Sequence, residues 1–183
     1  MRTAIHVWHL ELLTRPAPPA GQPGYTLAHV DTPTPEFARF LYAAVGVPWT
    51  WYMRLGWTHE QWETRFAQSN VELWVGYHAG QPIGYFELES EPNQSVEICY
   101  FGLMPQMIGR GFGRSFLEDA IDKAFTLGGQ RVWLHTCSLD HPNALGNYVS
   151  RGFEVFREED IVDDIPDDSP DPWYRPHIKK GRP

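Results

Sequence analysis

The sequence has few cysteines, no long apolar run and no excess of positive charge. Only two of its 183 residues are cysteine, Cys99 and Cys137, which excludes the disulfide framework of small secreted domains. No apolar stretch approaches the ~20 residues that a membrane-spanning helix needs. The first 15 residues alternate in polarity, unlike the apolar core of a signal peptide. We therefore expect a cytoplasmic protein with reduced thiols and no membrane partner.

The net charge of −8 gives no support for a nucleic-acid partner. Residues 158–171 contain eight acids and no base, and without them the chain has 15 acids and 15 bases. Two interpretations of this acidic segment stay open: a solvated surface segment, or the border of a site for a cationic substrate. Residues 173–183, in contrast, are locally basic.

Hydrophobic periodicity predicts an α/β (α+β) fold with a mixed sheet covered by helices. Thr34 followed by Pro35 is typical of a helix start, and Thr58 with Gln61 fits a capping box. Gly128 is a candidate left-handed cap at the end of a long helix. We expect strands at 3–13, 70–78, 82–90, 94–103, 131–139 and 153–159, and helices starting near 34, 58, 110 and 142.

A glycine-rich segment precedes the long helix expected over 110–127. Gly109, Gly111 and Gly113 alternate with larger residues, and the first acid of the helix is Glu118, although helix N-termini favour acids in their first turn. Glycines at a helix start let backbone N–H groups approach a phosphate. The segment lacks the lysine of a P-loop and the spacing of a dinucleotide fingerprint. It therefore indicates a different anion site.

This segment resembles the acyl-CoA pyrophosphate loop of the GNAT acetyltransferase superfamily, usually Arg/Gln-x-x-Gly-x-Gly/Ala. Gly111 and Gly113 match the last two fixed positions, and Ile108 stands where Arg or Gln is usual. The resemblance implies that acetyl-CoA is the co-substrate. It also implies these cofactor-binding residues: Phe101, Gly102 and Leu103 at the preceding strand end, and Ile108, Gly109, Arg110, Gly111, Phe112, Gly113 and Arg114 in the loop.

A second motif, "NALGNYVSRGF", resembles the family's late helix and strand, usually Ala-x-x-x-Tyr-x-x-x-Gly-Phe. His141 stands where the family usually has a CoA-binding asparagine, and Asn143 is a displaced candidate for that role. The resemblance implies that Tyr148 contacts the cofactor and is the general acid. It implies Glu97 as the general base, with Glu87 and Glu89 as rivals; each of these residues also has a purely structural interpretation.

An aromatic segment lies between the first two expected helices, which form the acceptor wall in the family. Trp49, Trp51, Tyr52 and Trp57 are candidate substrate-binding residues, or simply pack beneath the helices. His135 either lines the acceptor pocket or packs at the sheet. The pattern His135-x-Cys137-x-x-x-His141 lacks a fourth ligand at a usual spacing, so we expect no metal.

The resemblance implies a GNAT-like, mostly antiparallel sheet of about six to seven strands with about four helices. We expect one N-acetyltransferase domain over 1–183: a strand and Pro/Gly loop over 1–33, the core over 34–157, and an acidic then basic tail over 158–183. The expected activity is transfer of an acetyl group from acetyl-CoA to an amine of a small molecule or peptide. The alternative is a non-catalytic acyl-CoA-binding sensor or assembly module; a nucleotide-binding regulator fits the glycine spacing less well. Homodimers are common in the family, so a homodimer is a further expectation.

Overall fold

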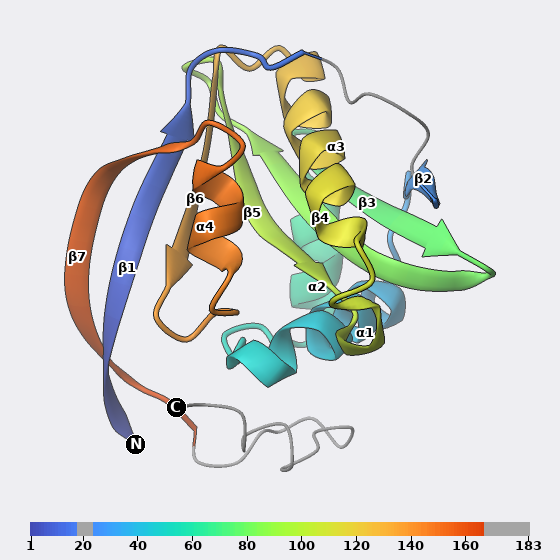
Figure 1. Cartoon of the computed structure of the whole chain (residues 1–183). Helices are drawn as coiled ribbons and strands as arrows, with labels where there is room; N and C mark the ends of the chain where they lie inside the picture. Colours follow the sequence, from blue (N-terminus) through green and yellow to red (C-terminus); the bar gives the residue numbers. More distant parts are fainter. Residues whose placement is uncertain (18–23, 167–183) are drawn as a thin grey trace.

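Seven strands form one sheet in the order β2-β3-β4-β5-β6-β1-β7, in a computed structural model that describes residues 1–17 and 24–166 (Figure 1). The strands are β1 (Arg2–Leu12), β2 (Thr26–His29), β3 (Val71–His78), β4 (Gln81–Ser90), β5 (Ser95–Leu103), β6 (Arg131–Cys137) and β7 (Glu154–Asp164). The helices are α1 (Pro35–Gly46), α2 (His59–Phe66), α3 (Phe112–Thr126) and α4 (Ala144–Val149), with 3-10 turns at Val47–Trp49 and Pro105–Met107. The expected fold class is confirmed.

All neighbouring strands are antiparallel except β5 and β6, and that parallel pair shapes the molecule. β5 and β6 pair only through residues 95–97 and 131–133, and beyond these residues each strand pairs with its other neighbour alone. The two strands therefore separate toward Leu103 and Cys137, as Figure 1 shows. The separation opens the middle of the sheet.

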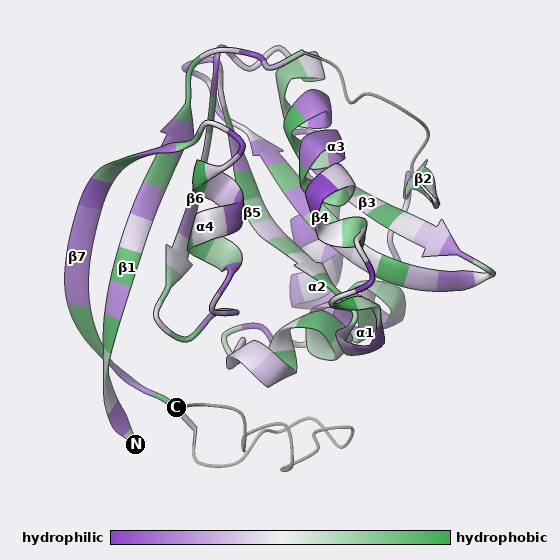
Figure 2. Ribbon diagram, in the orientation of Figure 1, coloured by the Kyte–Doolittle hydropathy of each residue, from purple (hydrophilic) through white to green (hydrophobic). Residues whose placement is uncertain are grey.

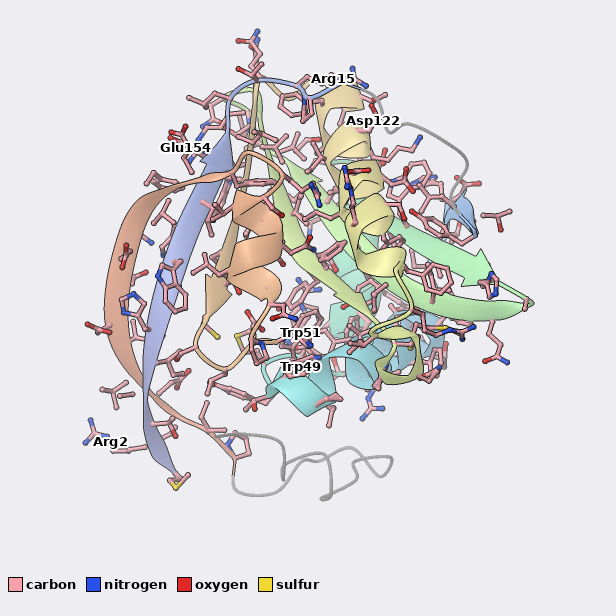
Figure 3. All side chains as sticks on the ribbon, viewed as in Figure 1. Arg2, Arg15, Trp49, Trp51, Asp122 and Glu154 are labelled. Atoms are coloured by element: carbon pink, nitrogen blue, oxygen red, sulfur yellow. The ribbon has the colours of Figure 1, made fainter. Side chains whose placement is uncertain are left out.

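The N-terminal strand β1 lies between β6 and β7 and is antiparallel to both. A bulge between His9 and Leu10 shifts its register against β7, so Ile5, Val7 and His9 are buried at alternate positions and Leu10 starts a new alternation. The Arg15 guanidinium bonds to Asp122 at 2.6 Å and ties the loop after β1 to α3 (Figure 3).

The structure corrects the sequence prediction at two strands. β2 was not expected, because its four residues are too few to show alternation. β7 continues to Asp164, so the first part of the acidic segment is not a loose tail but a strand that pairs with β1 along its length. Residues 167–171 of the acidic segment and the basic residues 173–183 lie outside the described residues.

The expected helix caps are confirmed. Thr34 accepts a hydrogen bond from the Phe37 N–H, and Thr58 forms a reciprocal capping box with Gln61. Gly128 has φ +89°, which ends α3 as expected. In the described part of the chain, no helix has the length and apolar character needed to cross a membrane.

Helices cover both faces of the sheet, and hydrophobic and hydrophilic residues follow one another along the strands and helices (Figure 2). Phe86 of β4 packs on Phe116 of α3, while the adjacent Glu87 points to Arg65 of α2. Because neighbouring strand residues point to opposite faces, α3 lies on one face and α1 and α2 lie on the other. The predicted apolar stripe of α3 is confirmed: Phe116, Leu117, Ala120, Ile121 and Ala124 are buried, and Phe112 and Phe125 pack at its edge.

Candidate active site

A cleft of about 730 Å³ lies where β5 and β6 separate. Its floor comes from both strands and from Ile5 and Val7 of β1, and residues 49–53 after α1 form one wall. The start of α3 and the helix α4 with its preceding loop close the other side. Trp49 and Trp51 lie beside this opening in Figure 3.

The cleft gathers most of the residues that the sequence singled out. Those that line it are Trp49, Trp51, Tyr52, Phe101, Gly102, Leu103, Ile108, Gly109, Gly113, Arg114, His135, His141, Asn143 and Tyr148. Those that do not line it are Glu97, Arg110, Gly111, Phe112 and Trp57. Phe112 packs on Tyr25 and His78, the Arg110 guanidinium lies 3.3 Å from the Met107 sulfur, and Trp57 packs on Trp62.

The glycine-rich loop leaves the start of α3 without a cap. Gly111 is the N-cap residue with φ +87°, and neither a capping side chain nor a first-turn acid is present. Gly109 has φ +79°, and a Cβ atom at either glycine would meet no atom within 4 Å. Both positions therefore combine a backbone conformation that favours glycine with open space above it. Uncapped N–H groups at a helix start are suited to an anion.

Tyr148 points from α4 into the cleft and is almost fully buried, with 8% of its surface exposed. Its ring packs against Phe101 and Phe153. Burial, together with the negative charge of Asp140, raises the pKa of Tyr148. Among the described residues its hydroxyl has no hydrogen-bond partner. The hydroxyl is thus protonated and available to a group in the cleft.

Glu97 and His135 form a pair at the point where β5 and β6 separate. Glu97 Oε1 lies 3.6 Å from His135 Nδ1, and His135, not Glu97, lines the cleft. The nearby Glu97 carboxylate raises the pKa of His135 above its ordinary value, against the opposing effect of burial. Glu97 therefore influences a group bound in the cleft only through its contact with the His135 imidazole.

The two rival carboxylates are held by arginines instead. Glu87 is 1% exposed, and its oxygens accept hydrogen bonds from Arg54 at 2.7 and 3.0 Å and from Arg65 at 2.9 and 2.5 Å. Arg65 also bonds to Glu89 at 2.6 Å. Neither carboxylate lines the cleft, so neither is placed to take a proton from a group bound there.

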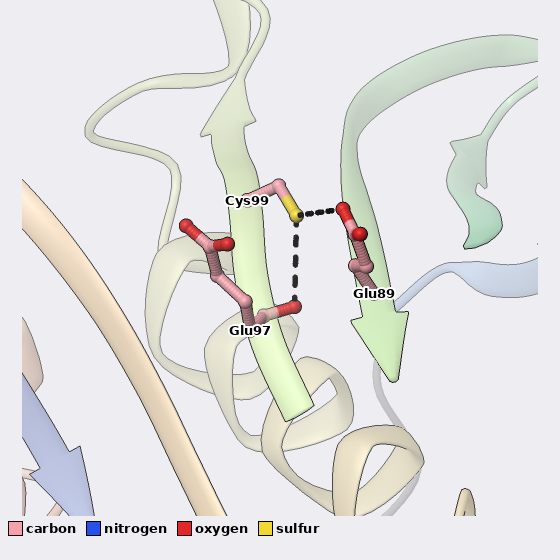
Figure 4. Close-up of side chains that lie close together, drawn as sticks. All are labelled: Glu89, Glu97 and Cys99. Atoms are coloured by element: carbon pink, nitrogen blue, oxygen red, sulfur yellow. Dashed lines mark hydrogen bonds between the residues drawn. The ribbon is translucent and has the colours of Figure 1, made fainter. Parts of the chain in front are cut away.

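Glu89, Glu97 and Cys99 bring three ligand atoms within 4.8 Å of one another (Figure 4). However, the Arg65 guanidinium donates to Glu89 and lies 3.5 Å from the Cys99 sulfur, and burial raises the pKa of the Cys99 thiol. The Arg65 guanidinium therefore already occupies the position next to these ligand atoms that a metal ion would need. His135, Cys137 and His141 do not form such a three-ligand group in residues 1–17 and 24–166.

Asp140 is a residue that sequence reasoning missed. Its carboxylate accepts hydrogen bonds from Thr136 Oγ1 at 2.7 Å, the Cys137 N–H at 3.0 Å and Trp51 Nε1 at 3.2 Å. An aspartate three residues after a strand is a common turn residue, and this signal alone did not distinguish it. Asp140 fixes Trp51 against the loop that enters α4.

Two further contacts anchor the wall formed by residues 49–53. The Trp49 and His141 rings lie 4.8 Å apart, and the Tyr52 hydroxyl donates to the Asp163 carboxylate. Burial and this hydrogen bond raise the pKa of Tyr52 to about 12. With the Trp51 contact, the wall is held at three points across the cleft.

The separation of β5 from β6, the uncapped start of α3 and the buried Tyr148 meet at one cleft. A sequence profile of the Acetyltransferase (GNAT) family matches residues 35–153. The chain belongs to this family. A comparison with curated proteins gave no significant match.

Solved structures show the same fold at low sequence identity. A GCN5-related N-acetyltransferase from Sphaerobacter thermophilus has 20% identity and a TM-score of 0.61, covering 86% of this chain and 50% of its own. One from Kribbella flavida has 17% identity and a TM-score of 0.58, covering 88% and 58%. A GNAT-family acetyltransferase from Streptococcus pneumoniae has 23% identity and a TM-score of 0.52, covering 71% and 87%. The chain thus spans only about half the length of the first two.

Proposed function

We propose that the protein transfers an acetyl group from acetyl-CoA to an amine of a small molecule or peptide. The observation that carries this proposal is the single cleft that joins an uncapped helix start to a protonated tyrosine and a carboxylate–imidazole pair. Family membership supports acyl transfer in general, and these features suit the amine chemistry.

Two regions of the cleft suit two parts of acetyl-CoA, its pyrophosphate and its pantetheine arm. The uncapped N–H groups at the start of α3, with Gly109 and Arg114 beside them, suit the pyrophosphate. The open edge of β5 near Phe101 to Leu103 offers backbone hydrogen bonds to the pantetheine arm. When bound, acetyl-CoA supplies the acetyl group as an activated thioester.

The cleft residues divide the proton transfers between them. An alkylammonium ion has a pKa near 10, so a group in the cleft must take its proton before it can attack. His135 accepts this proton at Nε2, the nitrogen that does not face Glu97, and Glu97 holds the ring and stabilises the imidazolium. Tyr148 donates its hydroxyl proton to the departing thiolate sulfur. Glu97 thus serves as a positioning residue, a change from its expected role as the general base.

Thermal unfolding with acetyl-CoA, ATP and NAD tests the co-substrate. A ligand at 100 times its dissociation constant stabilises a protein by about 2.7 kcal/mol, which for this size is roughly 5–10 °C in midpoint. We expect this rise with acetyl-CoA alone. No rise with acetyl-CoA, or a larger one with ATP, would contradict the proposal.

Turnover of Tyr148→Phe separates an enzyme from a non-catalytic acyl-CoA-binding module. We expect acetyl transfer to fall roughly 10²-fold or more while acetyl-CoA still raises the unfolding midpoint. Wild-type protein that binds acetyl-CoA but acetylates no amine would favour the binding module.

A further inference from the structure

Near the C-terminal end of β7, the floor of the cleft is apolar and is bordered by the Asp163 carboxylate. Strand register pairs Ile5 with Ile161 and Thr3 with Asp163, so Ile5, Ile161 and Asp163 share one face of the β1–β7 pair. All three line the cleft, and Tyr52 reaches over them from the opposite wall to bond to Asp163. We call this region the acceptor end.

The charged groups of the cleft are separated by sign. Arg114, beside the start of α3, is the one lysine or arginine among the described lining residues, and Asp140 and Asp163 are the carboxylates. The Asp163 oxygens accept from the Tyr52 hydroxyl and from the Asp164 N–H, both of which are neutral donors. No described lysine or arginine forms an ion pair with Asp163 or Asp140. The acceptor end therefore has a negative potential.

The remaining acids of β7 have other partners or another orientation. Glu159, two residues before Ile161, pairs with His9 and Arg157. Glu158 and Asp160 lie on the opposite face and bond to His6. The negative charge at the acceptor end is thus specific to Asp163 and is not a uniform property of the acidic strand.

We propose that the acceptor is an amine with a second cationic group, joined to the reacting amine by an apolar chain, and that Asp163 binds this second group. The inference rests on the proposed function. The reacting amine must be neutral when it attacks beside His135, so a cation held at Asp163 belongs to another group of the same molecule. Ile5, Val7 and Ile161 supply the apolar surface between these positions, and Asp163 disfavours acceptors that carry a carboxylate.

Isothermal titration without acetyl-CoA tests this recognition directly. The probes are cadaverine (a five-carbon diamine), n-pentylamine and 5-aminopentanoate, with the same chain and a different far end. We expect cadaverine to bind roughly five- to tenfold more tightly than pentylamine, as for one partly exposed charged hydrogen bond, and 5-aminopentanoate to bind most weakly. Asp163→Asn removes the charge but keeps an acceptor for Tyr52, and should abolish the preference for the diamine.

Two variants make the test specific. Asp164→Asn removes the same charge from the next residue, which points away from the cleft, and should keep the diamine preference. Tyr52→Phe removes the hydroxyl but leaves the carboxylate, and should also keep it. Equal affinities for cadaverine and pentylamine in the wild type, or an equal loss in Asp163→Asn and Asp164→Asn, would overturn the inference.

Acetylation assays with the same three probes separate this inference from the proposed function. Acetylation of cadaverine ahead of pentylamine, lost in Asp163→Asn, supports both. Equal acetylation of cadaverine and pentylamine overturns the acceptor class and leaves acetyl transfer intact. Asp163-dependent binding of cadaverine, with no acetylation of any probe, supports the cationic site and contradicts the proposed activity.

Discussion

We expect the substitution Glu87→Gln to lower the free energy of unfolding strongly although it hardly changes the shape of the side chain. The Glu87 carboxylate is 1% exposed and accepts four hydrogen bonds from Arg54 and Arg65, and Arg54 also stacks on Trp57 and Tyr100. The substitution Glu87→Gln keeps the side-chain shape and removes the charge. Two partly buried guanidinium groups then lose their main counter-charge.

The expected cost of Glu87→Gln is about 3–5 kcal/mol in the free energy of unfolding, as for breaking one side of a buried ion pair. For a chain of this size, this corresponds to a midpoint lower by roughly 6–20 °C. Urea unfolding followed by circular dichroism measures the free energy. The difference should persist at high salt, because a buried pair is little screened.

Glu89→Gln is the matched control for Glu87→Gln. Glu89 receives a single bond from Arg65 and its side chain is 30% exposed, so we expect a loss of no more than about 1 kcal/mol. If Glu87→Gln costs less than about 1 kcal/mol, or no more than Glu89→Gln, the buried network does not stabilise the fold as described.

Three further predictions concern pH and the glycine loop. Because Glu97 raises the pKa of His135, Glu97→Gln should shift the acidic limb of the kcat/KM profile to lower pH. An unshifted limb would show that Glu97 does not control the proton acceptor in catalysis. Bonds to two β7 carboxylates raise the pKa of His6, so its stabilising contribution should be full below its unfolded pKa and be lost as pH rises through the folded value. The midpoint of His6→Gln relative to wild type, followed across pH, checks this sign; a constant difference would contradict it. Gly111→Ala should cost about 1–2 kcal/mol in urea unfolding because of its left-handed φ, whereas a neutral result would show that the loop relaxes easily.

Local signals gave most of the fold. The caps at Thr34, Thr58 and Gly128 depend on a few neighbouring residues, so their chemistry can be read directly from the chain. Strand and helix periods gave most of the elements for the same reason. Helix α3 begins two residues later than expected, because Gly111 takes a left-handed conformation that cannot continue a helix.

Features that depend on distant residues were not predictable. The position of β1 between β6 and β7 follows from pairing with residues at least 120 positions away. The Arg54–Glu87 pair joins a loop to a strand with no repeating pattern between them. The acidic residues 158–164 are exposed, as a solvated segment would be, but their composition did not show that they extend the expected strand by pairing with β1.

The placement of β1 also affects how the chain emerges from the ribosome. Residues 2–12 are synthesised well before their partners in β6 and β7, which are residues 132–137 and 154–164. At synthesis rates of about 5–20 residues per second, β1 waits for several seconds without either neighbour. Its two edges are unpaired during that time, and an unpaired strand edge is a template for aggregation. The unpaired β1 carries charged or ionisable side chains at Arg2, His6 and Glu11. These groups oppose pairing of β1 with another chain.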